Sequence, residues 1–239
     1  MDIVYFQGPK IAPRELKYSL RSMAANVPHE RVYFLGHAPE WVTDVTLIEG
    51  NFPPHKWWNL HAKHRVLANP RVPIEEMTAF DDDMYVLNPV DKVPPMYIAD
   101  FLKRLMKDHE NENKKFRGKT TSYSEVTHNS INFLKTQGFG TEDIKNISVH
   151  TPRVYLKDDL VALAKLTEDL TAPIMWRTVY GNMYTEPELI PTDVKVFTDE
   201  QFDIVKAAGG DYMSSHNASI HIIEEYLDGL FPEKCAYEA

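Results

Sequence analysis

The chain is nearly devoid of cysteine and has no long hydrophobic run. Cys235 is the single cysteine among 239 residues, which excludes an intrachain disulfide and any zinc site built from several cysteines. No apolar stretch approaches the ~20 residues that are needed to cross a bilayer. The first residues, 1–6, have neither the basic nor the apolar segment of a secretory leader. We therefore expect a soluble, cytoplasmic protein without a membrane span.

Basic charge and several nucleotide-binding motifs are also scarce. The sequence has 26 Lys and Arg against 35 Asp and Glu, a formal net charge of -9. This balance argues against a general nucleic-acid surface and leaves only a local basic groove open. Neither G-x-G-x-x-G, nor a Walker loop, nor H-E-x-x-H is present, so dinucleotide, P-loop and zincin interpretations have no support. Hydrophobic residues make up 43% of the chain, which is ample for a packed core.

Three adjacent aspartates, Asp81, Asp82 and Asp83, stand at the end of the short apolar segment 77–80. A strand that ends in aspartates presents hard oxygen ligands at the carboxyl edge of a sheet, where open α/β sheets bind ligands. Such oxygens suit Mg²⁺ or Mn²⁺, and these cations also hold diphosphates. An acidic surface turn is the alternative, but it does not require the apolar residues that follow at 84–87. We therefore predict a Mg²⁺ or Mn²⁺ site at the three aspartates.

The spacing of apolar residues predicts an α/β fold. Buried runs predict strands at 3–6, 31–35, 45–48 and 78–80. Helical spacing predicts helices at 14–25, 59–68, 100–107, 130–136, 158–166 and 220–230. Because strands and helices alternate in the first third of the chain, we expect a mostly parallel, doubly wound sheet flanked by helices, with helical additions after it.

Histidines and one arginine are further candidates for a site. His150 follows the apolar segment 147–149, and a histidine fixed at a strand end is suited to act as a general base; a structural histidine is the alternative. Arg177 stands beside a tryptophan, where it serves packing or, near a diphosphate, binds phosphoryl oxygens with its planar fork. His61 and His64 lie three residues apart on a predicted helix. They lack a third ligand, so a polar helix face is favoured over a zinc site.

Segments in the same order along the chain resemble the Stealth family. The segment 15–23, ELKYSLRSM, resembles the family's LRYSLRS helix, and 39–42, PEWV, resembles its P-x-W-L segment. The segment 80–90 resembles its FNDDMF…V strand and loop. The remaining likenesses are Asn132, Phe139–Gly140, His150–Pro152 and Arg177 in its third block, and 230–238, LFPEKCAYE, in its closing LFPxxSxFE.

Stealth proteins are sugar-1-phosphate transferases, a group that includes capsule polymerases and the lysosomal-enzyme GlcNAc-1-phosphotransferase. The resemblance implies a fold of the glycosyltransferase-A kind, a nucleotide-sugar donor such as UDP-GlcNAc and a divalent metal. The metal-binding and catalytic positions correspond to Asp82, Asp83, His150 and Arg177. The donor-binding positions correspond to Arg21, Asn132 and, as a weaker match, Asp211.

Departures from the family pattern leave the details open. The second acidic residue of the family's first block is absent, and the usual Asn before the aspartate pair is Asp81 here. The leading expectation is a single domain, 1–239, that moves a sugar 1-phosphate to an acceptor hydroxyl. Within it, residues 1–98 would bind donor and metal, and residues 99–239 would bind the acceptor and carry the catalytic residues. The alternatives are a glycosyltransferase that releases a nucleoside diphosphate and a non-catalytic nucleotide-sugar-binding module.

Two further points stay open at this level. The acceptor is a polysaccharide, a protein, a small metabolite or a modified nucleic acid. The charge-dense segment 109–119 is expected to be an exposed loop, with an acceptor-binding lid as the alternative.

Overall fold

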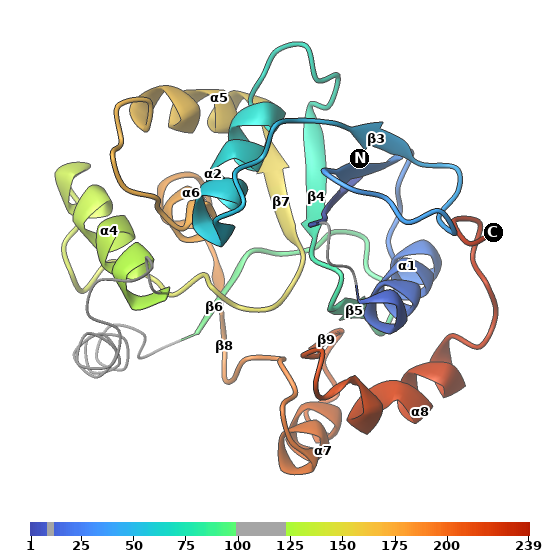
Figure 1. The fold of residues 1–239 in the computed structure, drawn as a ribbon. Helices are drawn as coiled ribbons and strands as arrows, with labels where there is room; N and C mark the ends of the chain where they lie inside the picture. The colour runs from blue at the N-terminus through green and yellow to red at the C-terminus, as the bar shows by residue number, and fades with distance from the viewer. Residues whose placement is uncertain (9–11, 99–122) are drawn as a thin grey trace.

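The computed structural model describes residues 1–8, 12–98 and 123–239 (Figure 1). At its centre is a five-stranded sheet of order β3-β2-β1-β4-β7. The strands are β1 (Asp2–Phe6), β2 (Val32–Leu35), β3 (Thr46–Ile48), β4 (Glu76–Phe80) and β7 (Arg153–Leu156). The first four are parallel, and β7 pairs antiparallel with β4. The predicted mostly parallel sheet is confirmed. The predicted helix 100–107 and loop 109–119 lie outside the described residues.

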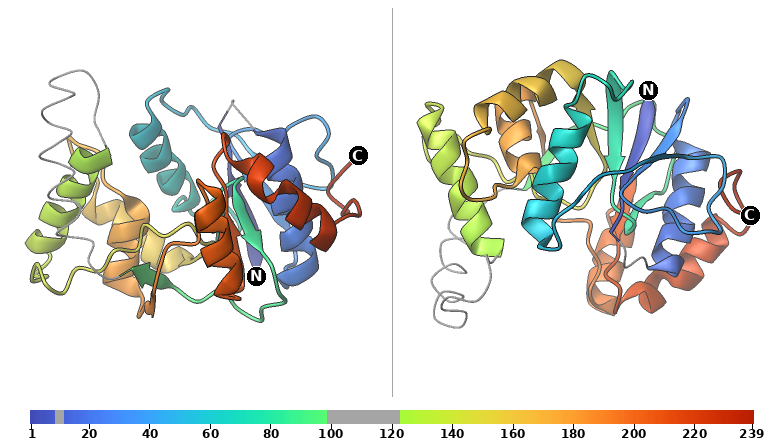
Figure 2. Two further views of the ribbon diagram at one scale, coloured as in Figure 1. Left: turned by 90° about the horizontal axis from the view of Figure 1, so that it is seen from below. Right: turned by 45° about the horizontal axis from the view of Figure 1, so that its top comes forward.

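Helices cover both faces of this sheet (Figures 1 and 2). One core contains residues of α2 (Lys56–Leu67), α5 (Lys157–Leu166) and α6 (Trp176–Tyr184), and the other contains residues of α1 (Pro13–Asn26). Successive residues of β1 alternate between the two cores, as a strand buried on both sides requires: Val4 belongs to the first, Ile3 and Tyr5 to the second. None of the helices in the described ranges has the length and apolar character of a membrane span.

Two small sheets carry the chain past the carboxyl edge of the central sheet. β5 (Met84–Val86) pairs antiparallel with β9 (Tyr212–Ser214), and β6 (Met96–Ile98) pairs in parallel with β8 (Glu188–Ile190). Three helices complete the described fold: α4 (Tyr123–Thr136), α7 (Asp199–Ala207) and α8 (Ile220–Leu230). The β5–β9 pairing matters for function because it brings the segment after residue 214 beside the aspartates.

A buried ion pair fastens the C-terminus to α1. Arg21 donates from Nε and Nη2 to the Glu238 carboxylate at 2.6 and 2.9 Å, and less than a tenth of either side chain is exposed. Its Nη1 donates to the carbonyls of Phe231 and Pro232. These bonds satisfy the guanidinium and hold the last residues, which follow α8, against the first helix.

Breaking this pair is expected to destabilise the protein. Glu238→Gln leaves the buried Arg21 charge without its carboxylate, and we expect a loss of about 3 kcal/mol, the low end for a broken buried pair because two carbonyls still accept from Arg21. The midpoint of urea unfolding measures it. Glu30→Gln is the matched control, because Glu30 pairs with the terminal amine at the surface and such pairs contribute less than about 1 kcal/mol. Equal midpoints for the two variants would show that this C-terminal clamp, the Arg21–Glu238 ion pair, does not stabilise the fold.

Candidate functional site

The aspartates lie where the sheet changes direction. From β1 the chain builds outward through β2 to β3 and then returns to place β4 on the other side of β1. The carboxyl ends of β1 and β4 therefore flank a switch point, the usual ligand-binding crevice of an open α/β sheet. Asp81, Asp82 and Asp83 follow directly on β4. The sheet edge predicted from sequence is thus the one that carries the cluster.

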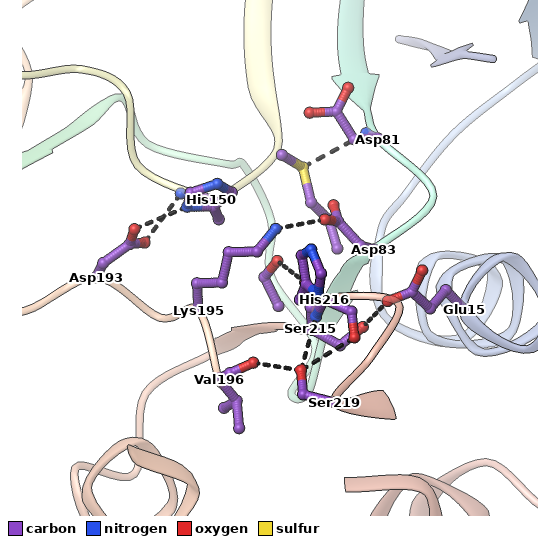
Figure 3. A network of polar contacts seen from close by, with 12 residues as sticks. Glu15, Asp81, Asp83, His150, Asp193, Lys195, Val196, Ser215, His216 and Ser219 are labelled. Atoms are coloured by element: carbon purple, nitrogen blue, oxygen red, sulfur yellow. Dashed lines mark hydrogen bonds and ion pairs between the residues drawn. The ribbon is translucent and has the colours of Figure 1, made fainter. Parts of the chain in front are cut away.

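The three carboxylates have different environments. Asp81 Oδ2 accepts from Arg177 at 3.0 Å. Asp83 Oδ2 accepts from Lys195 at 2.6 Å (Figure 3). Burial raises the pKa of Asp82 to about 7, aided by the charges of Asp83, Asp81 and Glu15. Burial also pushes the pKa of Asp81 upward, but Arg177, Arg153 and further cations outweigh it and hold that pKa below its ordinary value. Asp81 is thus paired with an arginine and Asp83 with a lysine, whereas Asp82 has no ion pair among the described residues.

Asp82 and Asp83 fit a divalent cation that is shared with a phosphate ligand. Asp83 Oδ1 is buried and has no hydrogen-bond partner in the described part of the chain. Within the described ranges, no three His, Cys, Asp or Glu side chains gather into a metal site of their own. Mg²⁺ is usually held by one or two carboxylates while water and substrate phosphates supply its other ligands. A pair of carboxylates therefore suits a cation that is bound together with a diphosphate.

The raised pKa of Asp82 predicts a pH-dependent stability effect in the metal-free protein. The unfolded chain releases this proton near the ordinary 3.8 and the folded protein near 7, so ionised Asp82 destabilises the fold increasingly between these values and fully above them. Asp82→Asn should raise the free energy of unfolding by roughly 2 kcal/mol at about pH 8, a figure discounted for partial solvent access, and leave it unchanged near pH 3.5.

Urea unfolding in EDTA at both pH values measures this effect. Asp83→Asn is the matched control, because it removes the partner of the nearly buried Lys195 and should not stabilise the fold. A variant Asp82→Asn that is no more stable than the wild type at about pH 8 would show that burial and the neighbouring carboxylates do not raise the pKa of Asp82.

His150 is held in one orientation by Asp193 (Figure 3). Its Nδ1 lies 2.7 Å from Asp193 Oδ2, and its backbone N–H donates to Asp193 Oδ1 at 3.1 Å. Burial raises the pKa of Asp193, but the hydrogen bond and charge of His150 outweigh burial and hold that pKa below its ordinary value. A proton on Nδ1 shared with the carboxylate leaves the lone pair on Nε2, the arrangement of a general base.

His150 reaches the site by a route that differs from the predicted one. The segment 147–149 is not a strand, and β7 begins only at Arg153. Because β7 runs antiparallel to β4, with Arg153 opposite Ala79, its start lies at the carboxyl end of β4. The histidine therefore precedes a strand and still lies at the edge where β4 ends.

Lys195 and Asp193 are site residues that the sequence reasoning missed. They alternate with Val194 and Val196, which pack into hydrophobic cores. That alternation of charged and apolar residues is the signal of an extended segment with one polar face, and it was available in the sequence. The segment pairs through Lys195 with Ser214 of β9 and delivers both charged side chains to the aspartates and His150.

A buried hydrogen-bond chain on the side of α1 is joined to Asp83 through the backbone, because the Ser215 N–H donates to the Asp83 carbonyl at 3.1 Å. Ser215 Oγ donates to Glu15 Oε1 at 2.5 Å (Figure 3). The Tyr85 hydroxyl, 2.6 Å from Ser215 Oγ, is the donor that remains for this oxygen. Burial raises the pKa of Glu15, and the nearby charge of Asp83 adds to the rise. The charge of Glu15 in turn contributes to the raised pKa of Asp82.

Three residues assigned to donor binding by the motif resemblance are not joined to this cluster. Arg21 is committed to the C-terminal clamp described above. Asn132 is exposed on α4. Asp211 accepts from Asn88 and precedes β9, at the end of the β5–β9 ribbon away from Asp83, since Met84 pairs with Ser214. None of the three has a hydrogen bond or ion pair with the cluster among the residues described.

The two histidines of α2 are core residues. His61 Nδ1 accepts from the Trp176 indole at 2.9 Å, and His64 stacks on the same ring. Burial lowers the pKa of His61 to about 4 and that of His64 to about 3, so both are neutral at physiological pH. Their role is packing, and the zinc interpretation gains no support.

A cavity of about 480 Å³ opens beside the catalytic candidates. His150, Asp193 and Lys195 form one wall, and Phe197 and Ile204, each 51% exposed, belong to the lining farther out. A volume of this size accommodates a small substrate or one residue of a polymer. His150 is therefore next to space for a second substrate.

Comparisons with known proteins give little identification. The sequence matches no family model and no curated protein. Among solved structures, the chain is similar to the apo-form glycosyltransferase GlyE of Streptococcus pneumoniae TIGR4, with a TM-score of 0.29 and 11% identity over 52% of this chain. The chain covers 41% of that structure's length. None of these matches identifies the family that the motifs resemble, and the function is inferred from the side chains that the fold brings together.

Proposed function

We propose that the protein is a transferase that uses a nucleotide-sugar donor and moves a sugar 1-phosphate to an acceptor hydroxyl. One observation carries this proposal: at the switch point of the sheet, a pair of under-compensated carboxylates lies beside an arginine and an Asp-oriented histidine. A divalent cation held by Asp82 and Asp83 would offset the charge of the donor diphosphate. Arg177 presents the planar fork that binds phosphoryl oxygens.

The chemical step assigns a role to each side chain. The acceptor, in the cavity beside His150, loses its hydroxyl proton to Nε2, and Asp193 stabilises the resulting imidazolium. The acceptor oxygen forms a bond to the β-phosphorus, and the bond between that phosphorus and the bridging oxygen breaks. A nucleoside monophosphate leaves with the electron pair. Lys195 holds Asp83 through its ion pair and keeps that carboxylate at the edge of the sheet.

Glycosyl transfer is the second candidate. It would use the same metal-binding carboxylates, with attack at the anomeric carbon and release of a nucleoside diphosphate. The position of Arg177 beside the aspartates favours attack at phosphorus. Attack at the anomeric carbon does not need an arginine and a base together at the β-phosphorus. A binding module without turnover is disfavoured, because binding alone does not need a histidine fixed by two bonds to Asp193.

The nucleotide product decides between these functions. The protein is incubated with Mn²⁺ and a panel of uridine, guanosine and thymidine diphosphate sugars, with and without added acceptors, and the released nucleotide is separated by ion-exchange chromatography. We expect release of a nucleoside monophosphate, and we expect this release to fall when His150 is replaced. A nucleoside diphosphate would establish glycosyl transfer instead. Donor binding without release of any nucleotide would favour the binding module.

A further inference from the structure

A second arginine lies beside Arg177 at the edge of the sheet. Arg153 is the first residue of β7 and pairs with Ala79, two positions before Asp81. Antiparallel pairing therefore starts its side chain at the same edge as the aspartates. Arg153, Arg177 and Asp81 together line a small cavity of about 30 Å³, and the two arginines also line a neighbouring one of about 20 Å³.

Positive charge is in excess at this place. Arg177 lies 3.0 Å from Asp81, whereas no ion pair between described residues includes Arg153. Arg153 Nη2 donates to the Val149 carbonyl at 3.1 Å, and its buried Nε has no hydrogen-bond partner in the described ranges. Two guanidinium groups beside one carboxylate leave one positive charge uncompensated, and a sheltered charge is costly unless it is paired.

Arg153 still carries its positive charge at neutral pH. Burial and the repulsion of Arg177 lower the pKa of Arg153 to about 10, which leaves its guanidinium cationic.

The lining of the cavity adds to its affinity for an anion. Met175 and Trp176 form part of the wall, and they stand at the start of α6, where helix N–H groups and the positive end of the helix dipole attract negative charge. The rings of Phe6, Trp57 and Tyr155 form other parts of the wall. Apolar surroundings exclude water and strengthen electrostatic interactions. The volume suits individual oxygens of a phosphoryl group, since one water needs about 10–15 Å³ of such space.

We propose that Arg153 and Arg177 together form a phosphoryl-binding site that works independently of the Asp82–Asp83 carboxylates, with Asp81 holding Arg177 in place. Two planar forks give bidentate recognition of phosphoryl oxygens. The proposal rests on the proposed function for the identity of the phosphoryl group, which would be the one transferred. The binding chemistry itself requires only a phosphate anion.

Binding of inorganic pyrophosphate in EDTA tests the site without metal and without turnover. Isothermal titration calorimetry should show saturable binding to the wild-type protein and at least about tenfold weaker binding to Arg153→Gln, because charge-assisted hydrogen bonds are lost. Arg31→Gln is the matched control: Arg31 pairs with Asp2 at the opposite end of β1, and its loss should leave the affinity unchanged. Circular dichroism and thermal unfolding verify that each variant is folded.

A second variant keeps the test decisive if Arg153→Gln fails to fold. Arg153→Lys keeps the charge and loses the fork, so its affinity for pyrophosphate should lie between wild type and Arg153→Gln, about threefold or more below wild type. Wild-type affinity in a folded Arg153 variant, or no saturable binding to the wild-type protein, overturns the inference. Inorganic phosphate in a parallel titration shows whether one phosphoryl group suffices.

The outcome is separable from that of the proposed function. Pyrophosphate binding that depends on Arg153, in a protein that releases nucleoside diphosphate or no nucleotide, would overturn the proposed function and support this site. Release of nucleoside monophosphate at wild-type rate by Arg153→Gln, with unchanged pyrophosphate affinity, would overturn the site alone.

Discussion

Asparagine in place of Asp83 is expected to lower turnover of the nucleotide-sugar donor by about 10³-fold, because metal stabilisation of several kcal/mol corresponds to a factor of ten per ~1.4 kcal/mol. The asparagine keeps the shape of the Asp83 side chain but loses its negative charge. That charge is one of those that raise the pKa of Asp82. Chelation of metal from the wild-type protein should abolish turnover to the same extent, and added Mn²⁺ or Mg²⁺ should restore it. Steady-state release of the nucleotide measures both effects.

Two controls accompany this prediction, and circular dichroism verifies that Asp83→Asn is folded. Asp169→Asn, at an exposed position just after α5, should leave turnover unchanged. Direct titration with Mn²⁺, followed by electron paramagnetic resonance, should show weaker binding to Asp83→Asn than to the wild type. Full activity in a metal-stripped wild-type sample would rule out the carboxylate pair as a metal site in the reaction.

The central fold was predictable because its strands are local signals. β1, β2 and β4 are short runs of buried apolar residues, and α1 and α8 have clear helical spacing. β7 was missed because Arg153–Leu156 alternates only weakly and becomes a strand by pairing with β4, more than seventy positions earlier. Strand formation of this kind depends on neighbours in space and not on the sequence of the segment.

The same difference separates the parts of the site that could be predicted from those that could not. Asp83, His150 and Arg177 stand out locally, as clustered acids or as polar residues beside apolar runs. Their partners do not, because Lys195 and Asp193 reach them only through the pairing of residue 195 with β9. A motif indicates which side chains lie at the edge of the sheet. Their charge state depends on contacts with residues that are far away in the sequence.

Loss of His150 is expected to lower turnover far more than donor affinity. General-base removal costs ~10²–10⁴-fold in rate, and the base acts mainly in the transition state, so His150→Ala should reduce kcat and leave the dissociation constant of the donor nearly unchanged. Asp193→Asn should act in the same direction with a smaller effect, because the imidazole is still present but its Nδ1 loses the charged carboxylate partner. His221→Ala, at an exposed position on α8, is the matched control.

The identity of the nucleotide product shows which atom of the donor is attacked in the step that these rates measure. Arg177→Lys should also lower turnover, because a point charge replaces the planar guanidinium beside Asp81. The planar guanidinium can donate two hydrogen bonds to the oxygens of the transferred phosphoryl group. A nucleoside monophosphate whose release falls in both His150→Ala and Arg177→Lys would place the attack at phosphorus. Wild-type turnover in His150→Ala together with a nucleoside diphosphate product would move the attack to the anomeric carbon. In that case the carboxylates keep their role, Arg177 serves to bind the departing diphosphate, and the proton of the acceptor leaves by another route.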